Sequence, residues 1–309
     1  MENRAFEIVN EVKKVIVGKD EVITKTLMAI LAGGHILLED VPGVGKTQLA
    51  LAFSKAMSLR YKRVQFTPDT MASDLVGFTM YNKETDSFVY KQGALACNLF
   101  LGDEINRTSA KTQSALLEAM EELQITVDGK TYMLPDPFIC IATQNPLGSA
   151  GTHALPDSQL DRFMIKLSMG YPSIENQVDI VKQRKGANPL ESVVEAASLE
   201  DINDMKSAVA NVHIDDEVIE YAATLCEKTR NNTDILQGAS PRAVLSLVQM
   251  ARACAFINER DYVVPSDVAS LFADVCAHRV ILTPKAKVSK TSAEEILQEI
   301  VKNTQAPRP

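Results

Sequence analysis

The sequence predicts an α/β fold in which a parallel sheet, covered by helices on both faces, is followed by a small all-α domain. Two patterns support this fold class. Up to about residue 167, short apolar runs alternate with amphipathic helical stretches, which is typical of parallel strands joined by helices. From Ser173 onward only helical periodicity continues, and we expect no further strands. The change predicts a first domain over residues 1–170 and a second over residues 171–309.

The expected elements follow in chain order. Helical stripes predict helices over residues 3–15, 20–31, 109–123 and 157–163, and a further helix runs from a glycine-rich turn to about residue 57. Buried apolar runs predict strands over residues 35–39, 61–66, 97–104, 138–143 and 164–167. Two inserted hairpins are expected, at residues 81–90 and 124–134. Six helices of the second domain are expected at about residues 174–185, 198–210, 215–230, 241–258, 265–279 and 292–303.

Composition argues against one class of function, sequence-independent nucleic-acid binding. The chain has 309 residues, 46% of them hydrophobic and 23% charged, as in ordinary globular proteins. Its net charge of −8 argues against sequence-independent nucleic-acid binding, which depends on Lys and Arg contacts to phosphates, although a local basic channel stays possible. We therefore expect no nucleic-acid partner.

The cysteines and the N-terminus indicate a compartment. Five cysteines are scattered through apolar runs without a C-x-x-C pair, which predicts reduced, buried thiols. The charged N-terminus does not resemble a signal peptide, and no apolar run approaches the roughly 20 residues of a membrane helix. The expectation is a cytoplasmic protein without membrane insertion.

The glycine-rich turn has the features of a phosphate-binding loop. It joins a buried strand to a helix, and its glycines let the backbone approach a polyphosphate closely. The loop and helix N–H groups would face the anion. Lys46 is placed to reach the β- and γ-phosphates, and the Thr47 hydroxyl is placed to bind Mg²⁺. The residues that we expect to contact the nucleotide here are Gly43, Val44, Gly45, Lys46, Thr47 and Gln48.

Asp40 departs from the G-x-x-x-x-G-K-[ST] pattern, because it stands where the first glycine is usual. Aspartate tolerates unusual backbone angles better than most residues, so the turn can form. A carboxylate beside phosphates would repel them. We therefore expect the Asp40 side chain to point away from the nucleotide.

Polar residues stand at the ends of two apolar strands. Asp103 and Glu104 end the strand over residues 97–104, at the carboxyl edge where ligands bind in open α/β folds. Asp103 would hold Mg²⁺, and Glu104 would act as general base toward water. Asn145 follows the strand over residues 138–143 and can orient the water and touch the γ-phosphate.

Three arginines are candidates for contacts to phosphate. Arg162 could neutralise transition-state charge in the next subunit's site as an arginine finger, and Arg107 is the rival for that role. Arg242 follows Ser240 and Pro241, which read as an N-cap and a first helical residue. A cation in the first turn is unfavourable unless an anion such as the γ-phosphate offsets it.

Together these motifs resemble the MoxR family of AAA+ ATPases, within the helix 2 insert class. The resemblance covers almost the whole chain. The segments that carry it are residues 41–47 (VPGVGKT), 102–107 (GDEINR), 113–120 (QSALLEAM), 142–146 (ATQNP), 155–163 (LPDSQLDRF) and 238–243 (GASPRA).

The resemblance implies roles that composition does not show. Asn145 takes the sensor 1 place, Arg162 the finger place and Arg242 the sensor 2 place, while Val17 and Gly18 would border the adenine. The hairpin within residues 72–92 matches the helix 2 insert. Members of this family are typically hexameric, chaperone-like remodellers. They often act with a partner bearing a von Willebrand factor A domain to mature or activate a client, frequently by metal or cofactor insertion.

The sequence therefore predicts a Mg²⁺-dependent ATPase that forms a homo-oligomeric ring and remodels a protein client. One alternative is the ATPase subunit of a metal chelatase. A nucleic-acid ring motor would need basic pore hairpins, and the hairpin at residues 124–134 has Lys130 against Asp128. A non-hydrolytic nucleotide switch is disfavoured by the presence of both Glu104 and Arg162.

Overall fold

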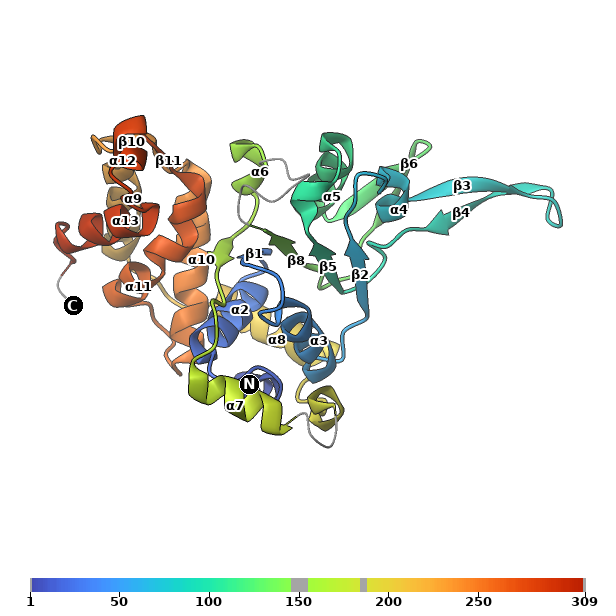
Figure 1. Ribbon diagram of the computed structural model, residues 1–309, viewed down its shortest axis with the longest axis horizontal. Coiled ribbons are helices and arrows are strands. Elements are labelled where there is room, and N and C mark those ends of the chain that lie inside the picture. The colour runs from blue at the N-terminus through green and yellow to red at the C-terminus, as the bar shows by residue number, and fades with distance from the viewer. Residues whose placement is uncertain (1, 146–154, 184–187, 308–309) are drawn as a thin grey trace.

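A five-stranded parallel sheet forms the centre of the protein (Figure 1). The structure, a computed structural model, describes residues 2–145, 155–183 and 188–307. Every pairing in this sheet is parallel, which confirms the predicted fold class. In spatial order the strands are β2 (Tyr61–Gln65), β5 (Leu99–Asp103), β8 (Ile139–Gln144), β1 (Ile36–Glu39) and β9 (Ile165–Leu167).

Helices cover both faces of this sheet, because alternate strand residues are apolar on both sides. Leu38 and Leu101 belong to a core shared with α1 (Glu2–Lys13), α2 (Asp20–Leu31) and α3 (Lys46–Ala56). Leu37 and Phe100 point the other way, into a second core. That second core is completed by α4 (Ala72–Val76) and α5 (Ala110–Glu122), and Ser109 caps α5, as one of the two predicted residues.

Two hairpins leave the α/β core. The longer one, β3 (Gly77–Asn82) with β4 (Ser87–Gln92), projects far from the rest of the molecule (Figure 1). It is longer than the predicted residues 81–90. The second hairpin is β6 (Gln124–Val127) with β7 (Lys130–Met133). Its turn residues Asp128 and Gly129 have φ angles of 50° and 76°, the left-handed conformations that a two-residue Asp-Gly turn requires.

The C-terminal part is helical but not purely so. After α6 (Asp157–Leu160) come α7 (Ile174–Gln183), α8 (Leu199–Ala210), α9 (Asp216–Arg230), α10 (Pro241–Ile257), α11 (Pro265–Cys276), α12 (Pro284–Val288) and α13 (Ala293–Lys302). Short 3₁₀ turns are η1 (Ile105–Arg107), η2 (Pro189–Ser192) and η3 (Ala277–Arg279), and η3 replaces the end of the helix predicted over residues 265–279.

The expectation that strands stop after Ser173 is wrong. β10 (Ile235–Gln237) pairs antiparallel with β11 (Ile281–Leu282). These segments are too short to show an alternating pattern, and each depends on a partner more than 40 residues away for its backbone hydrogen bonds. The second domain is therefore helical around one small strand pair.

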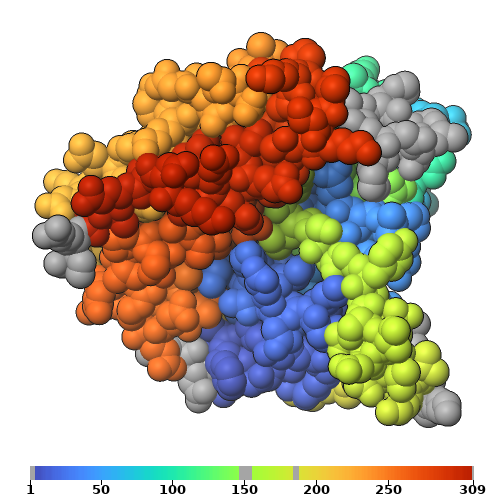
Figure 2. Space-filling model, turned by 60° about the vertical axis from the view of Figure 1, so that its left-hand side comes forward, coloured from blue at the N-terminus to red at the C-terminus, as the bar shows by residue number. Residues whose placement is uncertain are grey.

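The two parts of the chain share one core. Figure 2 shows the orange and red helices of the C-terminal part to the left of and above the blue N-terminal helices, with yellow-green α7 on their right. Buried residues of α1, α2 and α3 form one continuous cluster with those of α8, α9, α10, α11 and α13. The N–H groups of Ala196 and Ala197 also both donate to the Ala56 carbonyl of α3. The boundary at residue 170 stays a prediction. All five cysteines are buried and unpaired, as predicted.

Candidate nucleotide site

The turn between β1 and α3 is braced by its own lysine, which donates to two carbonyls at the start of the loop. Gly43 and Gly45 have φ angles of 88° and 103°, which a residue with a Cβ rarely adopts. Gly45 directly precedes α3, so the free N–H groups of the first helical turn face the loop. The Lys46 ammonium is buried and donates to the Asp40 carbonyl at 2.6 Å. Burial lowers the pKa of Lys46, against the opposing pull of nearby carboxylates.

The Asp40 side chain points away from this loop. Its carboxylate accepts hydrogen bonds from Ser168 Oγ at 2.8 Å, from the Met169 N–H at 2.6 Å and from the Gly170 N–H at 3.0 Å. These donors follow β9, so Asp40 fastens the phosphate loop to the neighbouring strand. The expected orientation is confirmed, and the aspartate has a structural reason for standing in place of glycine.

Asp103 and Glu104 end β5 at the carboxyl edge of the sheet. Asp103 accepts from Arg63 Nη2 of β2 at 2.7 Å and from Thr143 Oγ1 of β8 at 2.6 Å. Thr143 Oγ1 also accepts from the Glu104 N–H at 2.9 Å, so one hydroxyl ties both acidic residues to β8. The backbone of Glu104 is left-handed, with φ 58° and ψ 50°, a conformation that costs on the order of 1–3 kcal/mol outside glycine.

Three donors hold the Glu104 carboxylate. Asn145 Nδ2 donates to Oε1 at 2.9 Å, while Gln65 Nε2 and Arg107 Nη1 donate to Oε2 at 2.9 and 2.8 Å. The sequence analysis found Asn145 but missed Gln65 and Arg63. Arg63 lies in the middle of β2 and Gln65 at its end, and only the adjacency of β2 and β5 brings them to the carboxylates.

The phosphate loop, the carboxylates and Asn145 line one polar pocket. Thr47 offers a hydroxyl and Asp103 a buried carboxylate, which are the hard oxygen ligands that Mg²⁺ prefers. Within the described ranges no group of three or more His, Cys, Asp or Glu side chains could hold a metal. The site therefore fits a Mg²⁺ ion that takes its remaining ligands from nucleotide phosphates and water.

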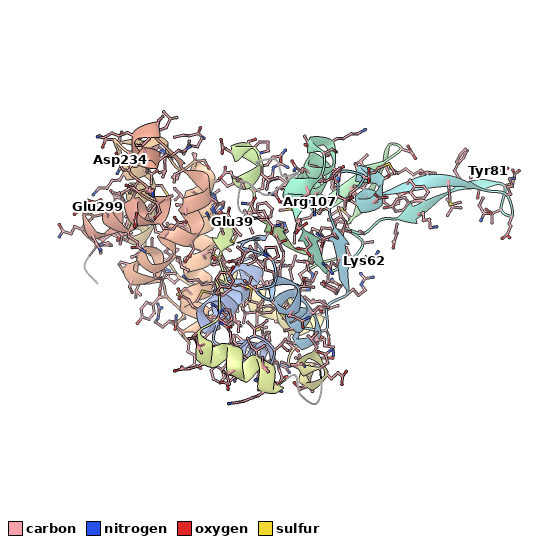
Figure 3. All side chains as sticks on the ribbon, in the orientation of Figure 1. Glu39, Lys62, Tyr81, Arg107, Asp234 and Glu299 are labelled. Atoms are coloured by element: carbon pink, nitrogen blue, oxygen red, sulfur yellow. The ribbon has the colours of Figure 1, made fainter. Side chains whose placement is uncertain are left out.

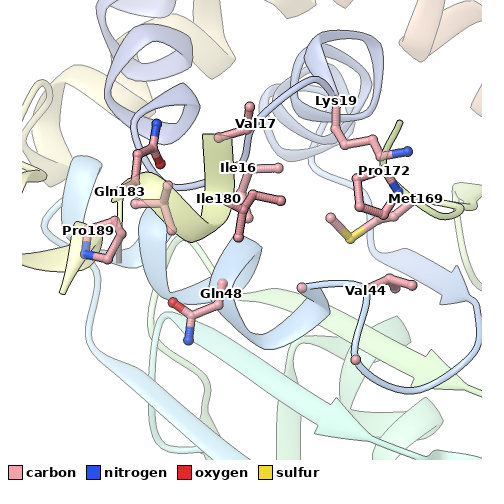
Figure 4. Close-up of a pocket in the computed structure, with 13 residues that line it drawn as sticks. Ile16, Val17, Lys19, Val44, Gln48, Met169, Pro172, Ile180, Gln183 and Pro189 are labelled. Atoms are coloured by element: carbon pink, nitrogen blue, oxygen red, sulfur yellow. The ribbon is translucent and has the colours of Figure 1, made fainter. Parts of the chain in front are cut away.

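A second, more apolar pocket of about 160 Å³ adjoins the first (Figure 4). Ile16 and Val17 border it from the segment after α1, and Ile180 borders it from α7. Gly18, next to Val17, has φ 70°, and a Cβ there would lie 1.9 Å from Asn176 Nδ2 of α7. Gly43, Gly45 and Gln48 line both pockets, so a purine in one would place its phosphates in the other.

Arg162 and Arg242 lie away from these pockets. Arg242 is the second residue of α10 and forms an ion pair with Glu121 of α5, an anion that offsets its unfavourable place at the helix N-terminus. Arg162 follows α6 in the turn before β9. Within the described part of the chain, the residues lining the two pockets include neither arginine.

The sequence analysis also missed Arg279 at the end of η3. Its side chain is only 1% exposed and forms an ion pair with Asp161, next to Arg162. Burial lowers the pKa of Arg279, while the Cys276 thiol and the Asp161 carboxylate oppose this shift. No sequence pattern pointed to this residue, because its partners lie more than 110 residues earlier.

Comparisons with known proteins agree with this geometry. Residues 35–165 match the family described as "ATPase family associated with various cellular activities (AAA)", and residues 227–300 match the "AAA lid domain". The chain is similar to the uncharacterized protein YeaC of Bacillus subtilis, with 44% identity over 299 residues, 97% of this chain and 93% of the relative.

It is also similar to Chaperone MoxR1 of Mycobacterium tuberculosis, with 36% identity over 307 residues, 96% of this chain and 81% of the relative. A crystal structure of a Cytophaga hutchinsonii protein, provisionally assigned as an ATPase, superimposes with a TM-score of 0.92 and 38% identity. That match covers 99% of this chain and 96% of the other.

In the residues that the structure describes, no helix has the length and apolar character needed to cross a membrane.

Proposed function

This chain belongs to the MoxR family of AAA+ ATPases, and from that premise we propose that it hydrolyses ATP with Mg²⁺. The active sites would lie at the subunit interfaces of a homo-oligomeric ring. The family resemblance supports six subunits in that ring. One observation carries the proposal. Lys46 of α3, the Asp103–Glu104 pair at the end of β5 and Asn145 after β8 line a single pocket that adjoins the second, more apolar one.

Each residue then has a task. Lys46 would exchange the Asp40 carbonyl for the β- and γ-phosphates, and Thr47 with Asp103 would hold the metal. Bound Mg²⁺ neutralises charge that develops on the phosphates. Glu104 would take a proton from the attacking water, and because only Asn145 donates to Oε1, that oxygen keeps an acceptor position for the water. Asn145 is placed to orient that water.

We assign the arginine finger to Arg162, acting on the neighbouring subunit. Arg162 does not line the pockets of its own chain, whereas its rival Arg107 is already bonded to Glu104 of the same chain. A supplied arginine can be worth about 10³-fold or more in rate. An isolated subunit should therefore hydrolyse ATP slowly. Arg242 is assigned to sense the γ-phosphate, leaving Glu121 when nucleotide binds.

The hairpins are proposed to contact a protein client. Figure 3 labels Tyr81 toward the tip of the projecting hairpin. Tyr90 of this hairpin stacks on Tyr132 of the other at 4.1 Å between ring centroids, so the two would move together. Large apolar side chains are exposed on β3 and β4, at 46% for Phe78, 46% for Met80, 47% for Tyr81, 75% for Phe88 and 44% for Val89.

This surface favours a protein over a nucleic acid. Three lysines on the two hairpins are matched by three acidic residues, so they form no basic groove for phosphates. The residues are Lys83, Lys91 and Lys130 against Glu84, Asp86 and Asp128. The five buried thiols fit a reducing compartment, and we place the protein in the cytoplasm. By family resemblance, a partner with a von Willebrand factor A domain would bring the client.

The test is ATP turnover per subunit across a wide range of protein concentration. Wild type should become more active per subunit as concentration rises. Glu104→Gln should lose about 10²- to 10⁴-fold in turnover while still binding ATP, as expected for a general base. Arg162→Ala should lose about 10³-fold. Turnover that is flat with concentration and indifferent to Arg162→Ala would refute the shared site and return the finger role to Arg107.

A further inference from the structure

Building on the proposed shared active site, we infer that Asp161, Ser240 and Arg279 form a clasp that positions the Arg162 finger and joins it to the helix carrying Arg242. The clasp would transmit the nucleotide state of one subunit to the finger that the same subunit offers its neighbour. Asp161 and Arg279 are thus positioning residues rather than catalytic ones.

Arg279 holds the backbone on both sides of Arg162. Its Nη2 donates to the carbonyls of Asp161 at 3.2 Å and Phe163 at 2.7 Å, and its Nε donates to Asp161 Oδ1 at 2.8 Å. Nη1 donates to the Met164 carbonyl at 3.1 Å. A planar guanidinium that satisfies this many acceptors fixes their relative positions more tightly than a flexible ammonium could.

Asp161 extends the clasp to α10. Its second oxygen, Oδ2, accepts from Ser240 Oγ at 2.9 Å. Ser240 is the N-cap residue of α10, yet its side chain accepts no hydrogen bond from that helix. Ser240 therefore links residues 161–164, the finger segment, to the start of α10, two residues before Arg242. This bond to Asp161 takes the place of the usual capping bond.

Burial makes the clasp rigid. The Arg279 side chain is 1% exposed, and His278 Nε2 also bonds to the Phe163 carbonyl at 2.9 Å. A buried guanidinium that lost these acceptors would stay desolvated without compensation, so opening the clasp is costly. When Arg242 leaves Glu121 for a phosphate, we expect α10 to shift with it. The finger segment, which is bonded to α10 through Ser240, should then move as well.

The experiment mixes two inactive subunits. A site donor carries Arg162→Ala and keeps Glu104, while a finger donor carries Glu104→Gln and keeps Arg162. Rings formed from the mixture contain interfaces with an intact site facing an intact finger, so ATP turnover should recover. Asp161→Asn added to the finger donor should reduce the recovered turnover at least tenfold. The same substitution added to the site donor should leave it within about twofold.

Only a positioning role predicts this asymmetry. Equal loss from both placements, or no loss from either, would overturn the clasp. If the parent mixture recovers no turnover, the shared active site itself is wrong, and the clasp falls with it. Arg279→Lys in the finger donor is the second variant and should act in the same direction as Asp161→Asn, because lysine keeps the charge but not the planar fork.

A matched control separates positioning from stability. Lys25 of α2 and Asp274 of α11 form another ion pair between the α/β core and the lid, at 2.5 Å. Among the described residues, their ion pairs link them to each other and to Glu21, and not to residues 161–164. Asp274→Asn in the finger donor should leave the recovered turnover within about twofold. Thermal unfolding and binding of a fluorescent ATP analogue should show that each variant is folded and binds nucleotide. An equal loss from Asp274→Asn would show that any weakened lid contact suffices and would refute the clasp.

Discussion

The nucleotide edge of the sheet and the projecting β3–β4 hairpin are opposites in their polar and apolar balance. At the sheet edge, the carboxylates of Asp103 and Glu104 are largely buried. They accept hydrogen bonds from Arg63 of β2, Thr143 of β8, Asn145 and Arg107. On the hairpin, Phe88 is apolar and 75% exposed. The first arrangement fixes a few atoms in place, as phosphate chemistry requires. The second leaves apolar surface exposed to solvent, as the proposed client binding would require.

Substitution of Asp40 should show how strongly the nucleotide edge depends on buried hydrogen bonds. Asp40→Gly removes the acceptor for two backbone N–H groups and the Ser168 hydroxyl. At about 1–3 kcal/mol for each unsatisfied buried donor, we expect the free energy of unfolding to fall by roughly 2–4 kcal/mol. Urea unfolding monitored by circular dichroism measures this change.

The same variant tests the orientation of Asp40. ATP affinity should not improve, since the wild-type carboxylate does not face the phosphates. A tenfold tighter Kd, about 1.4 kcal/mol, would contradict the orientation described here. Ser168→Ala serves as the control, because it removes one donor and leaves the other two bonds to Asp40 intact.

Lowering the pH from 7.5 to 5 should destabilise the core. The β3–β4 hairpin should contribute nothing to this histidine-dependent loss of stability, because it contains no histidine. Burial lowers the pKa of both His35 and His278 in the folded protein. Below the unfolded pKa of about 6.5, the unfolded chain then binds protons that the folded chain does not. Stability should fall with decreasing pH by about 1.4 kcal/mol per pH unit for each neutral buried histidine, until the folded pKa is reached.

Melting curves between pH 7.5 and 5 can isolate this term. His278→Gln, which keeps a donor for the Phe163 carbonyl, should show a shallower loss of stability than wild type. His213→Gln is the control, since its imidazole is 68% exposed and bonds only to Asp215 among the described residues. Parallel pH slopes for wild type and His278→Gln would mean that His278 is protonated in the folded protein.

The hairpin should give the smallest effect on stability and on basal activity. Phe88→Ser removes an exposed ring that packs edge to face on Tyr81, and surface changes of this kind are usually within about 0.5 kcal/mol. Basal ATP turnover should stay within twofold of wild type, while any stimulation by a client should be lost. A large fall in basal turnover would show that the hairpin contributes to the active site itself, and the contrast between the two regions would fail.

Sequence alone determined the parts of this protein whose chemistry is local. The residues of the phosphate loop are consecutive, from Gly43 to Thr47. The carboxylates and Asn145 each stand at the end of an apolar run. Because the carboxyl ends of parallel strands meet at one edge of the sheet, these positions predict the pocket that the structure contains. The MoxR family, the parallel sheet and the two hairpins were predicted for the same reason, because each depends on short-range pattern or consecutive motif residues.

Packing in three dimensions selects the distant side chains that complete these motifs. Arg63 and Gln65 reach Asp103 and Glu104 because β2 lies next to β5, an order that periodicity does not contain. Arg279 meets Asp161 across 118 residues of chain. Hydrogen bonds and ion pairs act over a few ångströms in space, whatever the separation along the chain. Their partners are therefore fixed by packing, which a single sequence specifies but does not display.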